Sequence, residues 1–279
     1  MTSATTTPIR SGFSPGEYLT CLNGIVWREA LRFLHQRERF ISALVRPLVW
    51  LFIFAAGFRQ VLGLSIIPPY ETYILYEVYI APGLMAMIQF FNGMQSSLSM
   101  VYDREMGSMR VLLTSPLPRW WLLGARLLAN TVTVLPIVYM FLLLARFWEV
   151  RPPGLGYVAV LPALTLAGLM LGAFGLALSS LIRQLENFAG VMNFVIFPLF
   201  FASTALYPLW RLEEVSPVLA GFAWANPFSH AVELIRFALY FQFEPMALAV
   251  CMAAFAVFFA FAVWGYDPGR GFWARRAAE

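Results

Sequence analysis

The ionisable residues that could do chemistry together are few, and one group of them lies late in the chain. His230, Glu233 and Arg236 are three residues apart, so in a helix they are close neighbours on one face. Such a group can form an ion pair or guide a polar ligand. Asn226 and Pro227, just before it, are residue types that begin helices. Within a membrane, the cluster is either part of an outer gate or an ion pair that fixes the local helices.

Catalytic or metal chemistry has little support in the rest of the sequence. The only histidines are His35 and His230, and neither HExxH, GxSxG nor a metal-spaced cluster is present. Cys21 and Cys251 indicate no disulfide framework. All 19 basic residues are Arg, so the phosphate-binding pattern GxxxxGK[ST], which needs Lys, is absent. We therefore expect no enzyme activity, metal or cofactor in this chain, and any ATP to be bound by a partner subunit.

A charged stretch at 102–119 could bind a soluble partner. Residues 103–113 can form a short charged helix, which Pro116 and Pro118 would end. An ordinary charged loop is the alternative. The charged side chains that such a helix would expose for docking are Arg104, Glu105 and Arg110.

A set of polar side chains lies inside a long apolar run, spaced so that they share one helix face. Its members are Gln89, Asn92, Ser96 and Ser99. They either line a translocation path or hydrogen-bond to neighbouring helices. In a later run, Gly168 and Gly172 form a GxxxG pair, which allows close helix packing within one subunit or between two copies.

The elements that position these residues are predicted by composition. Hydrophobic residues make up 60% of the 279 residues and charged residues 12%, against about 25% charged in soluble domains. Six apolar runs are long enough to span a bilayer, which takes about 20 residues. We therefore predict an all-α integral membrane protein with six transmembrane helices. The predicted spans are 41–64, 78–101, 122–147, 155–182, 188–207 and 246–266.

Two further segments are predicted to be helical. The Arg-rich stretch 18–39 has apolar residues at helical spacing and is expected to lie in the membrane interface or to pack on the ends of neighbouring helices. The segment 208–244 is too apolar for a plain loop and is expected to re-enter the membrane before the last span. The predicted organisation is thus a tail and amphipathic helix at 1–40, a transmembrane domain at 41–266 and a basic tail at 267–279.

The arginines predict the orientation. With both termini in the cytoplasm, 14 arginines fall on the inside and 5 on the outside, as the positive-inside rule requires. We expect a multi-pass protein of a bacterial plasma (inner) membrane, in contact with membrane lipid and without a nucleic-acid partner.

The charged stretch at 102–119 resembles the cytoplasmic loop of ABC-2 type transporter permeases, where an acidic residue and Gly precede a leucine pair and a Ser/Thr-Pro. The residues that match are Glu105, Gly107, Leu112, Leu113, Ser115 and Pro116. Residues 226–236, from Asn226-Pro227 to His230 and Arg236, resemble the family's C-terminal signature.

This resemblance implies that the loop is a coupling helix that docks on an ABC ATPase (nucleotide-binding) subunit. It also implies that two permease subunits, identical or similar, pair around a central path. The expected function is export, and the short outer loops favour an amphiphilic substrate such as a drug, lipid or glycan. A passive channel or a secondary transporter is the alternative, although the predicted spans are almost free of the acidic residues that proton coupling uses.

Overall fold

All regular structure is helical in the part of the chain that the structure, a computed structural model, describes, namely residues 14–35, 37–58, 68–70, 74–106, 117–182 and 184–266. The first helices are α1 (Pro15–His35), α2 (Arg37–Phe58), α3 (Tyr76–Glu105) and α5 (Arg119–Ala145), which continues into the 3₁₀ turn η1 (Arg146–Trp148). They are followed by α6 (Gly156–Leu181), α7 (Leu185–Phe201), α8 (Leu209–Val215), α9 (Pro217–Ala225), α10 (Pro227–Leu239) and α11 (Pro245–Gly265).

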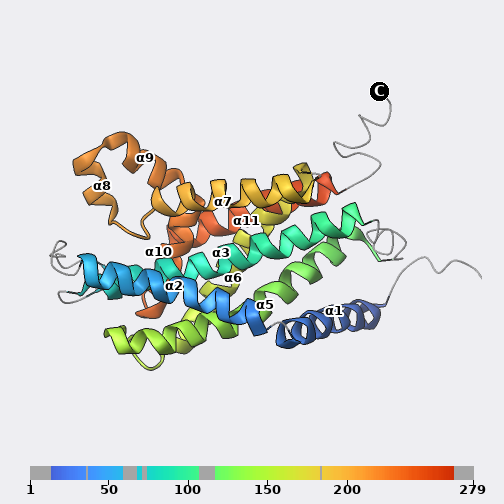
Figure 1. The fold of residues 1–279 in the computed structure, drawn as a ribbon, viewed down its shortest axis with the longest axis horizontal. Coiled ribbons are helices and arrows are strands. Elements are labelled where there is room, and N and C mark those ends of the chain that lie inside the picture. The colour runs from blue at the N-terminus through green and yellow to red at the C-terminus, as the bar shows by residue number, and fades with distance from the viewer. Residues whose placement is uncertain are drawn as a thin grey trace, which may run out of the picture.

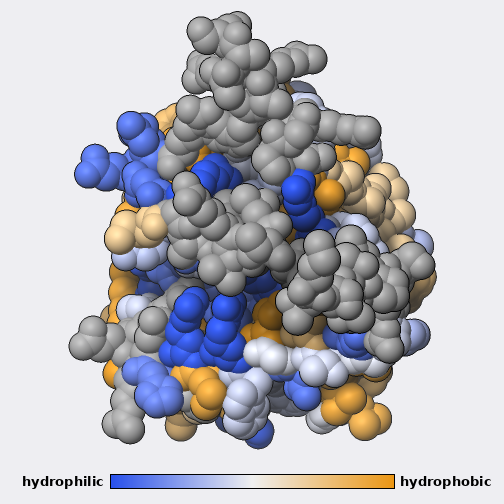
Figure 2. All heavy atoms as spheres, turned by 90° about the vertical axis from the view of Figure 1, so that its right-hand side faces the viewer, coloured by the Kyte–Doolittle hydropathy of each residue, from blue (hydrophilic) through white to orange (hydrophobic). Residues whose placement is uncertain are grey.

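The helices α2, α3, α5, α6, α7 and α11 lie along the longest axis of the molecule, and each runs opposite to the one before it in this series (Figure 1). The first helix, α1, runs in the same direction as α2. As a result, α3, α6 and α11 all finish at the end where α5 begins and α1 lies, whereas α8 and α9 project at the opposite end. We call the first the α1 end and the second the α8 end. Viewed onto the α1 end, hydrophilic residues gather in the middle of the face (Figure 2).

Three helices among the described residues are long and apolar enough to cross a membrane: α5 with η1, α6 and α11. The other three predicted spans correspond to α2, α3 and α7. Of these, α2 and α7 contain shorter apolar helices, Phe40–Phe54 and Leu185–Phe201. The 30 residues of α3 include the polar set predicted above. An all-helical membrane fold is therefore present, while the count of six spans stays a prediction.

The fifth predicted span is too long at its end. It was expected to reach residue 207, but α7 ends at Phe201 and residues 202–207 form turns. Ser203 directs its hydroxyl to the carbonyl of Phe200 and accepts from the amide of Ala205. This local bonding competes with helix continuation, although Ser203 to Leu206 are buried.

Helices α3 and α6 pack against each other at the centre of the bundle, and glycines allow their close approach. A Cβ added to Gly93 would lie 2.9 Å from the Cα of Gly172, and one added to Gly175 would lie 2.8 Å from the Ser97 hydroxyl. A Cβ on Gly168 would meet Thr131 of α5 at 2.8 Å. The glycines of the GxxxG pair thus pack helices within one subunit, which was one of the two alternatives.

The first helix, α1, packs along α5, with Tyr18 and Trp121 in edge-to-face contact at 5.1 Å between ring centroids. Its residues Leu22, Val26 and Ala30 are half-buried, but Leu19 of the same predicted apolar face is exposed. The packing alternative for this helix is therefore present in the structure, and an interfacial position stays a prediction.

Candidate functional site

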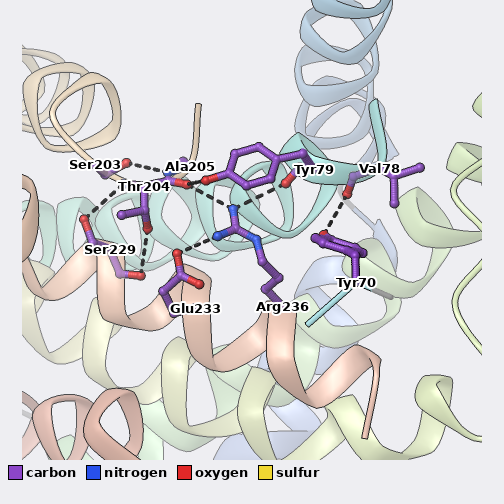
Figure 3. Close-up of polar contacts among 9 residues, drawn as sticks. All are labelled: Tyr70, Val78, Tyr79, Ser203, Thr204, Ala205, Ser229, Glu233 and Arg236. Atoms are coloured by element: carbon purple, nitrogen blue, oxygen red, sulfur yellow. Dashed lines mark hydrogen bonds and ion pairs between the residues drawn. The ribbon is translucent and has the colours of Figure 1, made fainter. Parts of the chain in front are cut away.

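The segment 208–244 consists of α8, α9 and α10, and α10 carries the predicted group of ionisable residues. Arg236 lies on its inner face and is only 2% exposed. Its guanidinium forms an ion pair with Glu233 one turn earlier, where Nη1 donates to Oε1. Its other end group, Nη2, donates to the carbonyls of Tyr79 (3.4 Å) and Thr204 (3.0 Å). One buried cation thus joins α10 to α3 and to the turn after α7 (Figure 3).

The ring of Tyr79 completes the surroundings of this cation. The Arg236 Cζ atom lies 4.0 Å from the Tyr79 ring centroid, a cation–π contact. The phenol of Tyr79 also donates to the Thr204 carbonyl at 2.9 Å, beside the bond from Arg236. A buried guanidinium requires this kind of compensation, because an unpaired charge in an apolar interior is very costly. We call Tyr79, Thr204, Glu233 and Arg236 the Arg236 cluster.

The non-helical backbone at 202–207 is satisfied by side chains. The Thr204 amide donates to the Ser229 hydroxyl at 3.2 Å, and the Leu206 carbonyl accepts from the Tyr76 hydroxyl at 3.0 Å. Backbone outside a helix is tolerated at membrane depth only where protein or water supplies its hydrogen bonds. The turn after α7 therefore depends on α3 and α10 for its stability.

The start of α10 is fixed as the sequence predicted. Asn226 is its N-cap, accepting from the Phe228 amide at 2.9 Å, and Pro227 occupies the first turn. The Asn226 amide group also donates to the carbonyls of Leu199 (2.7 Å) and Ala202 (2.9 Å) at the end of α7. This one side chain caps two helices at once.

His230 is separate from the ion pair, although it was grouped with Glu233 and Arg236. Its Nε2 atom is hydrogen-bonded to the Trp224 carbonyl at 2.8 Å, and its ring contacts the Trp224 indole. The reason is geometric, because two three-residue steps turn a helix by about 120° away from the starting direction. The three residues that were grouped nevertheless line one cavity of about 300 Å³, and Trp210 and Trp224 line it as well.

Two further tyrosines close the α8 end of the bundle. Tyr70 and Tyr240 are in edge-to-face contact, with ring centroids 4.8 Å apart, and the Tyr70 hydroxyl donates to the Val78 carbonyl at 3.3 Å. Burial raises the pKa of Tyr70. Burial, with a smaller effect of Tyr157, raises the pKa of Tyr240 to about 12. Both phenols therefore stay neutral at physiological pH and can act as hydrogen-bond donors.

At the α1 end, α3 carries a second network of polar residues. Arg126 of α5 is 6% exposed. It forms an ion pair with Asp103 (Nη1 to Oδ2, 3.1 Å) and donates from Nη2 to the Ser99 hydroxyl at 2.6 Å. Both partners lie in the last two turns of α3. We call Ser99, Asp103 and Arg126 the Arg126 cluster.

Arg104, the next residue on α3, joins this end to two more helices. It donates to the Ile182 carbonyl at 3.3 Å, just after α6, and lies 4.8 Å from the ring centroid of Tyr266, just after α11. The Tyr266 and Ser179 hydroxyls are 2.8 Å apart. Arg104 was predicted to be exposed for docking but is half-buried, because α3 continues to Glu105 and packs on its neighbours.

Only the two borders of the predicted docking stretch lie among the residues that the structure describes. Arg104 and the exposed Glu105 belong to the end of α3, and Leu117 precedes the start of α5. The remaining predicted docking residues lie outside the described residues: Gly107, Arg110, Leu112, Leu113, Ser115 and Pro116.

The polar residues predicted on one face of α3 make contacts within the chain. Gln89 is buried and donates to the Leu164 carbonyl of α6 at 2.9 Å, and Asn92 is buried and donates to the Ile88 carbonyl at 2.8 Å. Ser99 donates to the Ser96 carbonyl and accepts from Arg126. Gln89 and Ser99 thus contact neighbouring helices, as the packing alternative expects, whereas the described bond of Asn92 stays within α3. A path-lining role stays a prediction.

Sequence reasoning did not identify the partners of the two arginines as site residues. Tyr79 and Thr204 are separated from Arg236 by 157 and 32 positions, and both offer mainly backbone carbonyls, which leave no sequence signal. Asp103 and Arg126 are 23 positions apart on different helices. An Arg in the first turns of an otherwise apolar span was the available signal for that pair. No group of three or more potential metal-ligating side chains occurs in the described ranges.

The chain has clear similarity to known transport proteins. The sequence model of the ABC-2 type transporter family matches residues 21–240. A protein of Cyanophora paradoxa named transport permease ycf38 is 28% identical over 202 residues, 71% of this chain and 66% of that protein. Its counterpart in Porphyra purpurea is 26% identical over 228 residues, 79% of this chain and 74% of that protein.

A bacterial relative matches over a shorter region. The Escherichia coli (strain K12) protein named multidrug ABC transporter permease YbhR is 29% identical over 170 residues. The match covers 60% of this chain and 45% of that protein. The chain thus spans less than half the length of this relative and just under two thirds of the Cyanophora protein.

An all-helical bundle in which three of the described helices are long and apolar enough to cross a membrane is the architecture of a multi-pass membrane protein. The family match covers most of the chain, so the chain belongs to the ABC-2 type transporter family. Members of this family are membrane permease subunits, and membership implies pairing with an ABC ATPase subunit.

Proposed function

We propose that this chain is the permease subunit of an ATP-driven exporter in a bacterial plasma membrane. The observation that carries the proposal is the continuity of α3. One unbroken helix extends from Tyr79, in the Arg236 cluster, to Asp103 and Arg104 at the border of the docking stretch. A displacement of residues 104–116 by an ATPase subunit would therefore be transmitted to the opposite end of the bundle.

The α1 end faces the cytoplasm in this proposal. The arginine asymmetry supports this orientation. So does the gathering of hydrophilic residues on that end (Figure 2). The ATPase subunit, which binds the ATP, would dock there on Glu105 and the residues that follow.

Two copies of this chain, or this chain and a similar permease, would pair along α7. Asn187, Gly190 and Asn193 recur every three residues on α7 and are exposed in the single chain. Amide side chains facing lipid are unfavourable, whereas small and amide residues are typical of helix–helix contacts in membranes. The path between the copies would carry an amphiphilic substrate, in keeping with the apolar character of the spans and the name of the bacterial relative.

Coupling is tested first by isolation. The chain, purified from native membranes, should bring with it a stoichiometric ABC ATPase whose hydrolysis depends on the permease. Reconstituted together, the two should transport a fluorescent amphiphile only with ATP. Transport by the permease alone in vesicles would overturn the proposal and favour a passive channel or secondary transporter.

Glu105→Arg is the sharper test. Glu105 is exposed at the end of α3. Reversal of its charge should therefore lower permease-dependent ATP hydrolysis about tenfold or more, without loss of membrane insertion. Glu213→Arg is the matched control, because Glu213 is exposed on α8 at the opposite end. Equal ATPase activity in the two variants would exclude docking at Glu105.

A further inference from the structure

An apolar groove lies between α7 and the body of the bundle, away from both polar clusters. Its volume is about 500 Å³, and five phenylalanines from five helices line it: Phe90, Phe174, Phe194, Phe228 and Phe258. The floor is formed by Phe90 and Phe228, each 1% exposed, while Phe194 at the rim is 79% exposed. The groove is therefore deep and opens beside α7.

The groove lies near the middle of α3 and α7 and beside the start of α10. Phe174 and Phe258 belong to α6 and α11, two of the three helices long and apolar enough to cross a membrane. Phe90 is at the middle of α3, and Phe194 is at the middle of α7. Because the hydrocarbon core of a bilayer is about 30 Å thick, the medium at this depth is hydrocarbon rather than water or headgroups.

The chemistry of the lining restricts what can bind. All its side chains are apolar: besides the phenylalanines, they are those of Met, Leu, Val and Pro residues. A charged or hydrogen-bonding group would lose its hydration there and gain no partner. The ligand must therefore present hydrocarbon to the groove, and a volume of about 500 Å³ is within the range of drug-sized pockets.

The shape of the groove distinguishes between two hydrocarbon occupants. A helix of a second copy is a rigid cylinder about 10–12 Å in diameter with its side chains. A flexible alkyl chain can instead follow the contour of a floor that five helices of one chain enclose. We propose that the groove is a binding site for one acyl chain of a bilayer phospholipid.

The acyl chain would act as a packing element for α7. Along α7 only Phe188, Ile196 and Phe200 are fully buried, so much of the surface of this helix is left to contacts from outside the chain. A lipid chain between α7 and the α6–α11 pair would supply the missing van der Waals contacts. This inference stands independently of ATP coupling. Phe194 lies on the same face of α7 as Gly190, so the proposed pairing of two copies must leave the mouth of the groove open to lipid.

Photolabelling tests the proposal directly. The permease is placed in nanodiscs with a phospholipid that carries a diazirine midway along one acyl chain, and labelled residues are mapped by mass spectrometry. Labelling at Phe174 and Phe258, which line the groove and are half-buried, should exceed that at Val257 at least threefold. Val257 adjoins Phe258 on α11 at the same depth but is 64% exposed, outside the groove lining. A diazirine next to the headgroup should label the groove poorly.

Matched variants make the test specific. Val195→Phe adds a ring inside the groove and should lower labelling of Phe174 at least threefold, whereas Val257→Phe adds the same ring on the open surface and should leave it unchanged. Phe194→Ala, which widens the rim and removes no buried contact, should raise labelling of Phe258.

Equal labelling of Phe258 and Val257 would mean annular lipid only and would overturn the proposal. Labelling that appears only in nanodiscs holding a single permease would show that a second copy covers the groove, and would overturn it too.

Discussion

A buried arginine from another helix contacts each end of α3, Arg236 of α10 at the α8 end and Arg126 of α5 at the α1 end. The two arginines have different partners. Nη2 of Arg236 donates to two main-chain carbonyls, while Nη1 binds a carboxylate on its own helix. The described hydrogen bonds of Arg126 go to side chains of another helix, Asp103 and Ser99. The side chain of Asp103 is 38% exposed, whereas that of Glu233 is 24% exposed.

This difference separates a structural cluster from an adjustable one. Arg236 supplies a hydrogen bond to the backbone at 202–207, so its loss removes one of the two described donors to the Thr204 carbonyl and leaves Glu233 without its ion-pair partner. Arg126 joins two helices through side-chain groups that can rotate away and be solvated near the surface. We infer that α3 is fixed at the α8 end and can change its contacts at the α1 end, where the proposed docking stretch begins.

The largest effect is expected for Arg236→Met. The change removes the charge, leaves Glu233 without its partner and removes the donor to Tyr79 and Thr204, so it should destabilise the protein by about 3–5 kcal/mol. Thermal unfolding in detergent measures this loss. The double variant Arg236→Met/Glu233→Gln should recover part of the stability, because the uncompensated carboxylate is then absent. If Arg236→Met alone were as stable as the wild type, the Arg236 cluster would not be the structural one, and the distinction between the two ends would be lost.

A smaller effect is expected for Arg126→Met. It removes one ion pair and one charge-assisted hydrogen bond, but Asp103 can be hydrated, so the cost should be about 1–2 kcal/mol. Because the contact joins α3 to α5 beside the docking stretch, permease-dependent ATPase activity should fall more than stability does. Arg211→Met is the control, since its pair with Glu214 is exposed at the α8 end and should contribute less than about 1 kcal/mol. If Arg126→Met cost as much stability as Arg236→Met, both ends would be structural.

Sequence reasoning predicted the helices that carry the two arginine clusters better than it predicted the contacts between those helices. Apolar run lengths located α3, α5, α6 and α11 to within a few residues, whereas the predicted end of the first span at residue 64 lies outside the described residues. Asn226-Pro227 predicted the start of α10, because these signals are local. The end of α7 was placed six residues too late, since an apolar stretch such as 202–207 is compatible with a helix until tertiary hydrogen bonds compete.

The partners of the arginines could not be read from local pattern. Tyr79 and Thr204 contribute carbonyl oxygens, which every residue has, so nothing in their side-chain types marked them as ligands of Arg236. Arg104 illustrates the opposite error. Its charge beside a predicted loop indicated exposure, yet the helix extends past it and its guanidinium packs on Tyr266. Long charged side chains can bury their stems while their end groups reach a partner.

The smallest effect is expected from removing one hydroxyl at each end. Tyr76→Phe takes the donor from the Leu206 carbonyl, which is buried in the turn after α7, and should cost about 1 kcal/mol or slightly more. Tyr266→Phe takes away the bond to the Ser179 hydroxyl, but Ser179 also donates to the Leu176 carbonyl and the ring remains beside Arg104. Its cost should be about 0.5 kcal/mol. Chemical denaturation in matched detergent compares the two variants. A greater loss of unfolding free energy for Tyr76→Phe would show that the backbone at the α8 end depends more on side-chain hydrogen bonds. The reverse order would mean that the α1 end is the more rigid of the two.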